Sequence, residues 1–186
     1  MDELTLMQRA RQGDSEAFEA IFDAYHARIY NYIYRLMGDS EDASDLTQES
    51  FLKAYRALAR GDKPRNLSAW LYRIASNICL DVLRRRRLIQ WQPLENLLAV
   101  LGVGGARSPE EEVIQHERQS EIERVLAQMP ARYRMYLILR EREGLSYQEI
   151  SAITGDSLDT VRVTLFRARE RAREIGVQLH AGSKKS

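Results

Sequence analysis

The stretch GLSYQEISAITGDSLDTVRVTLFRARERAR, residues 144–173, decides the fold, because it has the signals of two short helices joined by a tight turn. Ser146 and Glu149 form an S-x-x-E capping box, which specifies where the first helix begins. Gly155 suits the left-handed cap at the end of that helix, and a second helix begins three residues later. This order predicts a helix-turn-helix over about residues 146–165.

The second helix of this motif is basic, with five arginines between Asp159 and Arg173. At 100° per residue it has an apolar face that we expect to pack inward: Leu158, Val161, Leu165, Ala168 and Ala172. The outward face is predicted to hold Asp159, Arg162, Val163, Phe166, Arg167 and Arg173. Such a face suits the major groove of DNA, where arginines contact guanine edges or phosphates and apolar side chains meet thymine methyl groups. A solvated charged face is the simpler alternative, but the cap, the turn and the outward apolar residues disfavour it.

Charge is concentrated by segment, although the 28 Lys+Arg and 27 Asp+Glu of the chain nearly cancel. Residues 1–59 carry a net charge of −5, and residues 60–90 carry +6. Residues 91–131 carry −4, and residues 132–186 carry +4. Two basic segments separated by acidic ones predict two contact sites for a polyanion, with other surfaces left for a basic partner.

The composition excludes several classes of protein. The 186 residues are 44% hydrophobic, enough for one ordinary domain or two small ones. No apolar run approaches the roughly 20 residues that span a bilayer, so we expect no membrane insertion and a cytoplasmic location. The single cysteine, Cys79, excludes an internal disulfide, and His26, His116 and His180 are too scattered for a zinc site. We therefore expect no metal and no cofactor.

Glycine and proline are sparse and the apolar spacing is helical nearly everywhere, which predicts an all-α protein without strands. We expect two small helical domains, residues 1–90 and 119–186, joined by a flexible linker over residues 91–118. Pro93 and three nearby glycines mark the linker. Residues 60–66 are predicted to be a loop, and the polar residues after Leu179 are predicted to be a disordered tail. The helices before the helix-turn-helix are expected at residues 15–37, about 40–58, about 68–87, 108–129 and about 131–143.

The N-terminal domain offers two candidate binding surfaces. One is an acidic helix face that suits a basic protein partner and repels DNA: Asp42, Asp45, Gln48 and Glu49. An ordinary solvated face would explain it equally well. The other combines stacking, hydrogen bonding and phosphate contact, as single-stranded DNA requires: Trp70, Arg73, Asn77 and Arg84. A lone tryptophan, however, is more often a core residue.

Three stretches in matching order resemble bacterial sigma factors of the sigma-70 family, extracytoplasmic-function (ECF) group. DLTQESFLKAYRAL, residues 45–58, resembles the segment that docks on the clamp helices of the RNA polymerase β′ subunit. NLSAWLYRIASNICLDVLRRRR, residues 66–87, resembles the segment that melts and reads the minus-ten promoter element. The stretch from Pro130 through LREREGLSYQEISAITGDSLDTVRVTLFRARE resembles the reader of the minus-thirty-five element.

The resemblance also implies which residues make each contact. The residues that it implies bind polymerase are Asp42, Asp45, Leu46, Gln48, Glu49 and Phe51. The residues that it implies contact the minus-ten element are Arg60, Lys63, Arg65, Asn66, Leu67, Trp70, Arg73, Asn77 and Arg84. It also implies that the loop of residues 60–67 forms a pocket for a base flipped out of the duplex. Minus-thirty-five contacts fall on Ser157, Asp159, Thr160, Arg162, Val163, Thr164, Phe166 and Arg167.

The function that the resemblance implies is that of a dissociable specificity subunit with no reaction of its own. It would bind core RNA polymerase through the β′ clamp helices and the β subunit and initiate transcription at a stress- or signal-dependent set of promoters. An anti-sigma factor is the further partner that it implies. An autonomous helix-turn-helix regulator is the alternative, but it leaves residues 45–87 unexplained. A helical enzyme would need a phosphate-binding loop or a set of metal ligands, and the sequence shows neither. Cys79 is better explained as a buried core thiol than as a reactive one.

Overall fold

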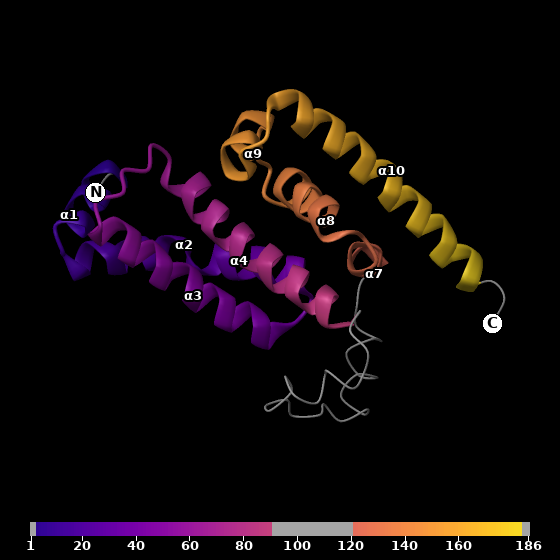
Figure 1. Ribbon diagram of the computed structural model, residues 1–186, viewed down its shortest axis with the longest axis horizontal. Coiled ribbons are helices and arrows are strands. Elements are labelled where there is room, and N and C mark those ends of the chain that lie inside the picture. Colours follow the sequence, from indigo (N-terminus) through magenta and orange to yellow (C-terminus); the bar gives the residue numbers. More distant parts are fainter. Residues whose placement is uncertain (1–2, 91–120, 184–186) are drawn as a thin grey trace.

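The computed structural model describes residues 3–90 and 121–183, and every regular element in these two ranges is a helix, as predicted. The N-terminal unit holds α1 (Glu3–Arg11), α2 (Ser15–Met37), α3 (Ser40–Ala59) and α4 (Leu67–Gln90). The C-terminal unit holds α7 (Glu121–Ala127), α8 (Ala131–Leu137), the π-helical turn η1 (Ile138–Arg142), α9 (Tyr147–Thr154) and α10 (Leu158–Ser183) (Figure 1). The predicted linker, residues 91–118, lies outside the described residues.

Local signals place the first helices where the sequence predicts them. Gly38 ends α2 in the left-handed conformation, with φ of 79°. Asp39 then caps α3 by accepting a hydrogen bond from the Asp42 backbone N–H at 2.9 Å. The bundle core comes from one stripe of each of α2, α3 and α4: Ile21, Tyr25, Ile29, Ile33, Leu36, Ala43, Leu46, Phe51, Ala54, Leu58, Leu71, Ala75 and Ile78. Helix α1 was not predicted; Tyr25 of α2 donates a hydrogen bond to its Glu3 carboxylate.

The helix-turn-helix forms from α9 and α10. Both halves of the predicted capping box are present, because Ser146 accepts from the Glu149 backbone N–H and the Glu149 carboxylate accepts from the Ser146 backbone N–H. Gly155 ends α9 with φ of 77°. Val161, Leu165 and Ala168 are fully buried, so the predicted inward face of α10 is confirmed at its centre.

Three expectations for the C-terminal unit were wrong in detail. Leu158 is 37% exposed, because it begins α10 at the edge of the packed face. Helix α10 continues to Ser183, although the polar residues after Leu179 were expected to form a tail. The helix predicted over residues 131–143 splits into α8 and η1. Ser108, the predicted start of the preceding helix, lies outside the described residues.

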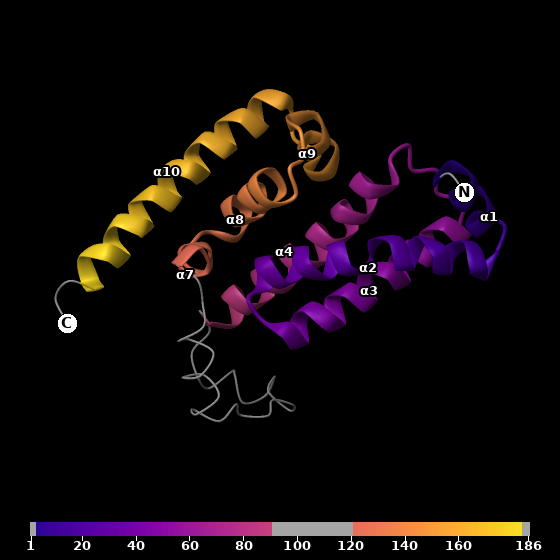
Figure 2. The same ribbon diagram turned by 180° about the vertical axis from the view of Figure 1, so that it is seen from behind.

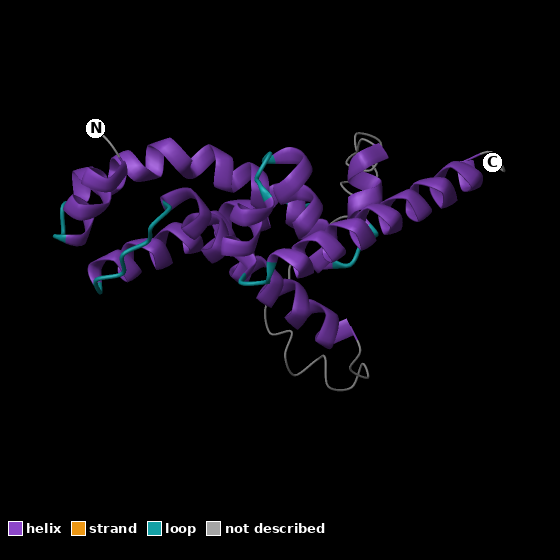
Figure 3. Cartoon of the chain, turned by 90° about the horizontal axis from the view of Figure 1, so that it is seen from above, coloured by secondary structure: helices purple, strands orange, loops and turns teal. Residues whose placement is uncertain are grey.

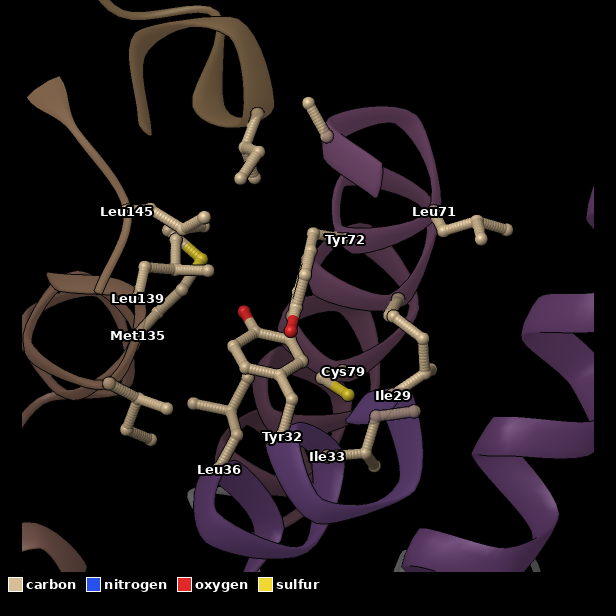
Figure 4. Packing of buried hydrophobic residues seen from close by; sticks show 14 of the residues in the cluster. Ile29, Tyr32, Ile33, Leu36, Leu71, Tyr72, Cys79, Met135, Leu139 and Leu145 are labelled. Carbon is tan, nitrogen blue, oxygen red and sulfur yellow. The ribbon is translucent and has the colours of Figure 1, made fainter. Parts of the chain in front are cut away.

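The two units pack directly on each other. Helix α4 lies between α3 on one side and α8 and α9 on the other (Figures 1 and 2). Met135, Leu139 and Leu145 of the C-terminal unit face Tyr32 and Tyr72 of the N-terminal unit across a shared core (Figure 4). The far end of α10 projects away from this contact, as the view from above shows (Figure 3).

The carboxylate of Glu143 joins the two units. It follows η1, is 8% exposed, and accepts a 2.6 Å hydrogen bond from the Tyr72 hydroxyl of α4. It also accepts a 3.1 Å hydrogen bond from Nη1 of Arg35 in α2. Burial, together with the hydrogen bond to Glu143, raises the pKa of the Tyr72 phenol above its ordinary value, so this hydroxyl remains a donor. One buried charge thus receives partners from two helices of the opposite unit.

Cys79 lies in the same core as these tyrosines. Its side chain is fully buried, and burial raises the pKa of its thiol to about 12. Because the thiolate is the reactive form, this side chain is an unreactive packing residue at neutral pH. The sequence-based interpretation of Cys79 as a core thiol agrees with this placement.

Loss of the Glu143 charge should lower the free energy of unfolding more than loss of an exposed charge nearby. Glu143→Gln removes the charge that Arg35 and Tyr72 solvate, and we expect it to lower the free energy of unfolding by about 1–3 kcal/mol. Glu141→Gln is the control, because Glu141 forms an exposed ion pair with Arg169 and its loss should cost less than about 1 kcal/mol. Denaturant unfolding of both variants measures the difference, and equal losses would contradict the role of Glu143.

Candidate nucleic-acid interface

The exposed side of α10 carries a mixture of basic and apolar residues. Phe166 is 65% exposed and Val163 is 48% exposed, so two apolar side chains face solvent on this side of α10. Arg162 and Arg167 are exposed beside them. The outward face predicted from the sequence therefore forms a continuous surface that has the chemistry of major-groove contact.

Other predicted contact residues at this end of α10 have structural roles. Ser157 accepts a 3.2 Å hydrogen bond from the Thr160 backbone N–H and so caps the helix. Asp159 accepts from Arg162 at 3.0 Å and holds that guanidinium near the helix start. Thr164 is only 8% exposed, so the prediction that it contacts DNA needs correction.

A hollow of about 430 Å³ adjoins this face. It brings predicted residues together with two side chains of α8 that sequence reasoning missed, and its lining is Arg132, Tyr133, Thr160, Val163, Thr164 and Arg167. The sequence signal for these two residues is the basic first turn of α8 after Pro130. It was missed because that turn lies beside α10 only in the folded protein. The basic surface is thus wider than one helix.

The exposed face of α4 carries the second candidate surface. Arg73, Asn77 and Arg84 recur at helical spacing and are all exposed, so they lie along one stripe. Trp70 is partly buried and packs against the core. Arg84 also forms an exposed ion pair with Asp81 at 2.8 Å. A stripe of this composition suits the bases and phosphates of a single strand.

The loop that precedes α4 divides into exposed and structural residues. Arg60, Lys63 and Arg65 are exposed to solvent. Asn66, however, caps α4, because its side-chain oxygen accepts from the Ala69 backbone N–H at 2.8 Å. Leu67 is buried in the core. The assignment of Leu67 to direct DNA contact therefore needs correction, whereas the three basic residues remain available.

The acidic face of α3 is smaller than the sequence suggests. Asp45, Gln48 and Glu49 are exposed, and Glu49 pairs with Lys53 of the same helix at 2.8 Å. Asp42 is occupied by Arg86 of α4, whose two Nη atoms donate to its two oxygens at 2.6 and 2.7 Å.

Two apolar residues assigned to this face point the other way. Leu46 and Phe51 are buried beneath α3, and Phe51 packs edge-on against Phe22 of α2. They support the acidic face from below and do not present a surface to a partner, which corrects their assignment as contact residues.

No group of three or more His, Cys, Asp or Glu side chains with the geometry of a metal site occurs among the described residues. None of the helices in the described ranges combines the length and apolar character that crossing a membrane requires.

Comparison with known proteins gives a family match in each of the two units. Residues 21–89 match the family described as Sigma-70 region 2, and residues 119–171 match Sigma-70, region 4. The ECF RNA polymerase sigma factor SigW of Bacillus subtilis is 31% identical over 178 residues, covering 90% of this chain and 93% of that protein. The RNA polymerase sigma-H factor of Pseudomonas aeruginosa is 36% identical over 173 residues, covering 89% of each chain.

Solved structures show the same fold. The structure of CnrH in complex with the cytosolic domain of CnrY has a TM-score of 0.68 at 21% identity and covers 96% of this chain and 97% of that one. The sigma factor RpoE of Bartonella quintana, solved with the anti-sigma factor NepR, has a TM-score of 0.62 at 24% identity and covers 85% of this chain and 95% of that one.

The described residues form helices only and carry two exposed basic faces, one of them on a helix-turn-helix, a combination typical of DNA-binding proteins. The chain belongs to the sigma-70 family and is a sigma factor of the ECF group.

The capping box predicts a pH dependence at the start of α9. Hydrogen bonds from the backbone N–H and the hydroxyl of Ser146 hold the pKa of Glu149 below its usual range. A lowered folded-state pKa stabilises the protein above the unfolded-state pKa, and this contribution is lost as pH falls through the folded-state value. We expect the stability deficit of Glu149→Gln to be present at pH 7 and to shrink toward pH 3. Thermal unfolding of both proteins across this range measures it, and a deficit independent of pH would contradict it.

Proposed function

We propose that the exposed surfaces of α3, α4 and α10 have separate roles in promoter recognition. The acidic face of α3 docks on the β′ clamp helices of core RNA polymerase. The stripe of α4 and the basic loop before it hold the melted minus-ten strand, and the outward face of α10 reads the minus-thirty-five duplex. The observation that carries the proposal is the separation of charge, since acidic and basic side chains gather on different helices.

The proposed docking surface is the exposed part of α3, which consists of Asp45, Gln48 and Glu49. Exposed carboxylates steer association with a basic partner and repel the phosphates of DNA. Asp42 contributes indirectly, because its ion pair with Arg86 fixes α3 against α4. The face that binds polymerase is thereby held in a constant position relative to the stripe that binds DNA.

We propose that the β subunit is contacted through the C-terminal unit. An apolar hollow of about 270 Å³ lies between α7, η1 and α10, and its lining includes Val125, Leu137 and Ile138. Ile122 at its edge is 54% exposed. Exposed apolar surface of this kind is typical of an interface with a partner protein.

The packing of the two units bears on how both promoter elements are read. The elements named minus-ten and minus-thirty-five lie about 25 base pairs apart, which is ~85 Å along B-form DNA. Helices in direct contact, as α4 and α9 are, lie only about 10 Å apart. We therefore propose that the described arrangement is a closed form, and that the units separate when the protein reads both elements.

The remaining features of the proposal follow the family. The protein acts in the cytoplasm by binding, with no reaction of its own. An anti-sigma factor withholds it from polymerase until a signal arrives, and the promoters that it serves are a stress- or signal-dependent subset. The autonomous regulator is not favoured, because it gives no role to the acidic face of α3.

Charge reversal on α3 tests the docking surface. Asp45→Lys with Glu49→Lys should weaken binding to core polymerase at least tenfold, because two favourable contacts become repulsive. Glu19→Lys with Asp23→Lys is the matched control, since these exposed acids of α2 have the same spacing and the change in charge is the same. Titration of labelled protein with core polymerase measures both affinities. Equal affinity for the two double variants would contradict the docking assignment.

A substitution on α10 tests the duplex-reading face. Arg162→Ala should lower run-off transcription from a cognate promoter by about tenfold or more, the effect of losing one base or phosphate contact. It should leave binding to core polymerase unchanged. Arg171→Ala is the control, because Arg171 lies farther along α10 in an exposed pair with Glu174. Equal transcription by Arg162→Ala and the unsubstituted protein would remove Arg162 from the reading face.

A further inference from the structure

A cleft of about 580 Å³ lies where the two units meet. One wall comes from α4 and includes Asn77, Arg84 and Arg87. The opposite wall comes from α8 and α9 and the residues beside them, and includes Arg132, Arg134 and Asp156. The size is that of sites for small ligands. Because neither unit supplies both walls, the cleft exists only while the units are packed together.

The cleft is strongly basic. Four arginines line it against a single acid, Asp156. That carboxylate is already occupied, since it accepts hydrogen bonds from Arg132 at 2.9 Å and from the Tyr136 hydroxyl. Among the described residues Arg84 pairs with Asp81 alone, in an exposed contact of the kind that contributes little stability. The lining therefore carries an excess of positive charge.

Arg134 shows the imbalance most clearly. Its Nε is buried and has no hydrogen-bond partner among the described residues. Burial lowers the pKa of its guanidinium below the ordinary value, yet an arginine of this kind stays charged at neutral pH. In the described part of the chain neither Arg134 nor Arg87 forms an ion pair with an acid. A buried guanidinium nitrogen without a hydrogen-bond partner is costly, and an anion close enough to accept from it would relieve that cost.

We propose that this cleft binds a small ligand of the oligophosphate class, with at least two phosphate groups. Guanidinium groups donate paired, parallel hydrogen bonds to phosphate oxygens, which makes several converging arginines a selective site for such ligands. Asn77 of α4 adds a neutral donor on one wall. The proposal needs only the described closed form, and it holds whether or not the protein initiates transcription.

Binding in this cleft would have a consequence that does rest on the proposed function. A ligand held by both walls favours the closed form, because it has lower affinity for separated units. Asn77 and Arg84 are also proposed to contact the minus-ten strand, so ligand and DNA would compete for them. The oligophosphate would thus reduce promoter binding without touching α10.

Calorimetric titration of the full chain with inorganic tripolyphosphate tests the site, without DNA or polymerase. We expect saturable binding of one ligand per chain. Arg134→Gln should weaken it by about tenfold or more. Arg87→Gln, on the exposed end of α4, should weaken it likewise and carries little risk to folding. Arg171→Gln removes the same charge far along α10, so it should leave the affinity unchanged.

A double variant tests whether the site needs both units. Tyr72→Phe with Glu143→Gln loosens the contact between units, although neither residue lines the cleft. We expect this variant to bind tripolyphosphate more weakly than the unsubstituted chain. Unchanged affinity would overturn the requirement for the closed form.

Three other results would overturn the proposal itself. One is the absence of saturable binding at millimolar tripolyphosphate, and another is equal weakening by Arg171→Gln and Arg134→Gln. The third is binding of a short single-stranded oligonucleotide but not of tripolyphosphate, which would assign the cleft to DNA alone. Loss of transcription activity with intact tripolyphosphate binding would count against the proposed function only.

Discussion

The packing of the two units depends on one buried carboxylate. Glu143 cannot be left unsolvated inside the protein, and its partners, Tyr72 and Arg35, both come from the opposite unit. The contact therefore has a defined geometry that apolar packing alone would not impose. Around it, Tyr32 and Tyr72 pack edge-on at 5.1 Å between their ring centroids and complete the shared core. This arrangement holds the basic stripe of α4 against the unit that carries the helix-turn-helix.

The same contact sets a conflict between stability and function. The closed form buries apolar surface and satisfies Glu143, whereas the proposed reading of two distant promoter elements requires that the units separate. Opening must expose Met135 and Leu139 to water, so binding to polymerase and DNA has to supply the free energy that closure otherwise provides. Any ligand or partner that binds only the closed form shifts the balance the other way. The contact between units is therefore a natural point of control.

Much of this fold could be predicted because its signals are local. Gly38, Gly155 and the capping box at Ser146 fix helix ends by short-range hydrogen bonds and by backbone conformations that few residues adopt. The burial of Val161 and Leu165 follows from helical spacing alone. What could not be predicted depends on distant partners. Nothing near Glu143 in the sequence indicates that Arg35 and Tyr72 will meet it.

The candidate site shows the same limit. Periodicity identified the exposed residues of α10 and α4, whereas the resemblance assigned contacts to whole segments and so included buried residues. Leu46 and Phe51 lie in the segment that resembles a docking site, yet they face the core, because an amphipathic helix alternates partner-facing and buried positions. Arg134 was not predicted at all, since its environment is created by the packing of α4 on α8.

The most direct test of the account is the distance between the units in the free protein and in the initiation complex. Spin labels at Asp23→Cys on α2 and Gln178→Cys on α10 would report it, since both positions are exposed and the buried Cys79 thiol does not compete for the label. We expect a single, narrowly distributed distance in the free protein that changes by tens of ångströms when core polymerase and promoter DNA are added. An unchanged distance in a complex that initiates transcription would contradict it.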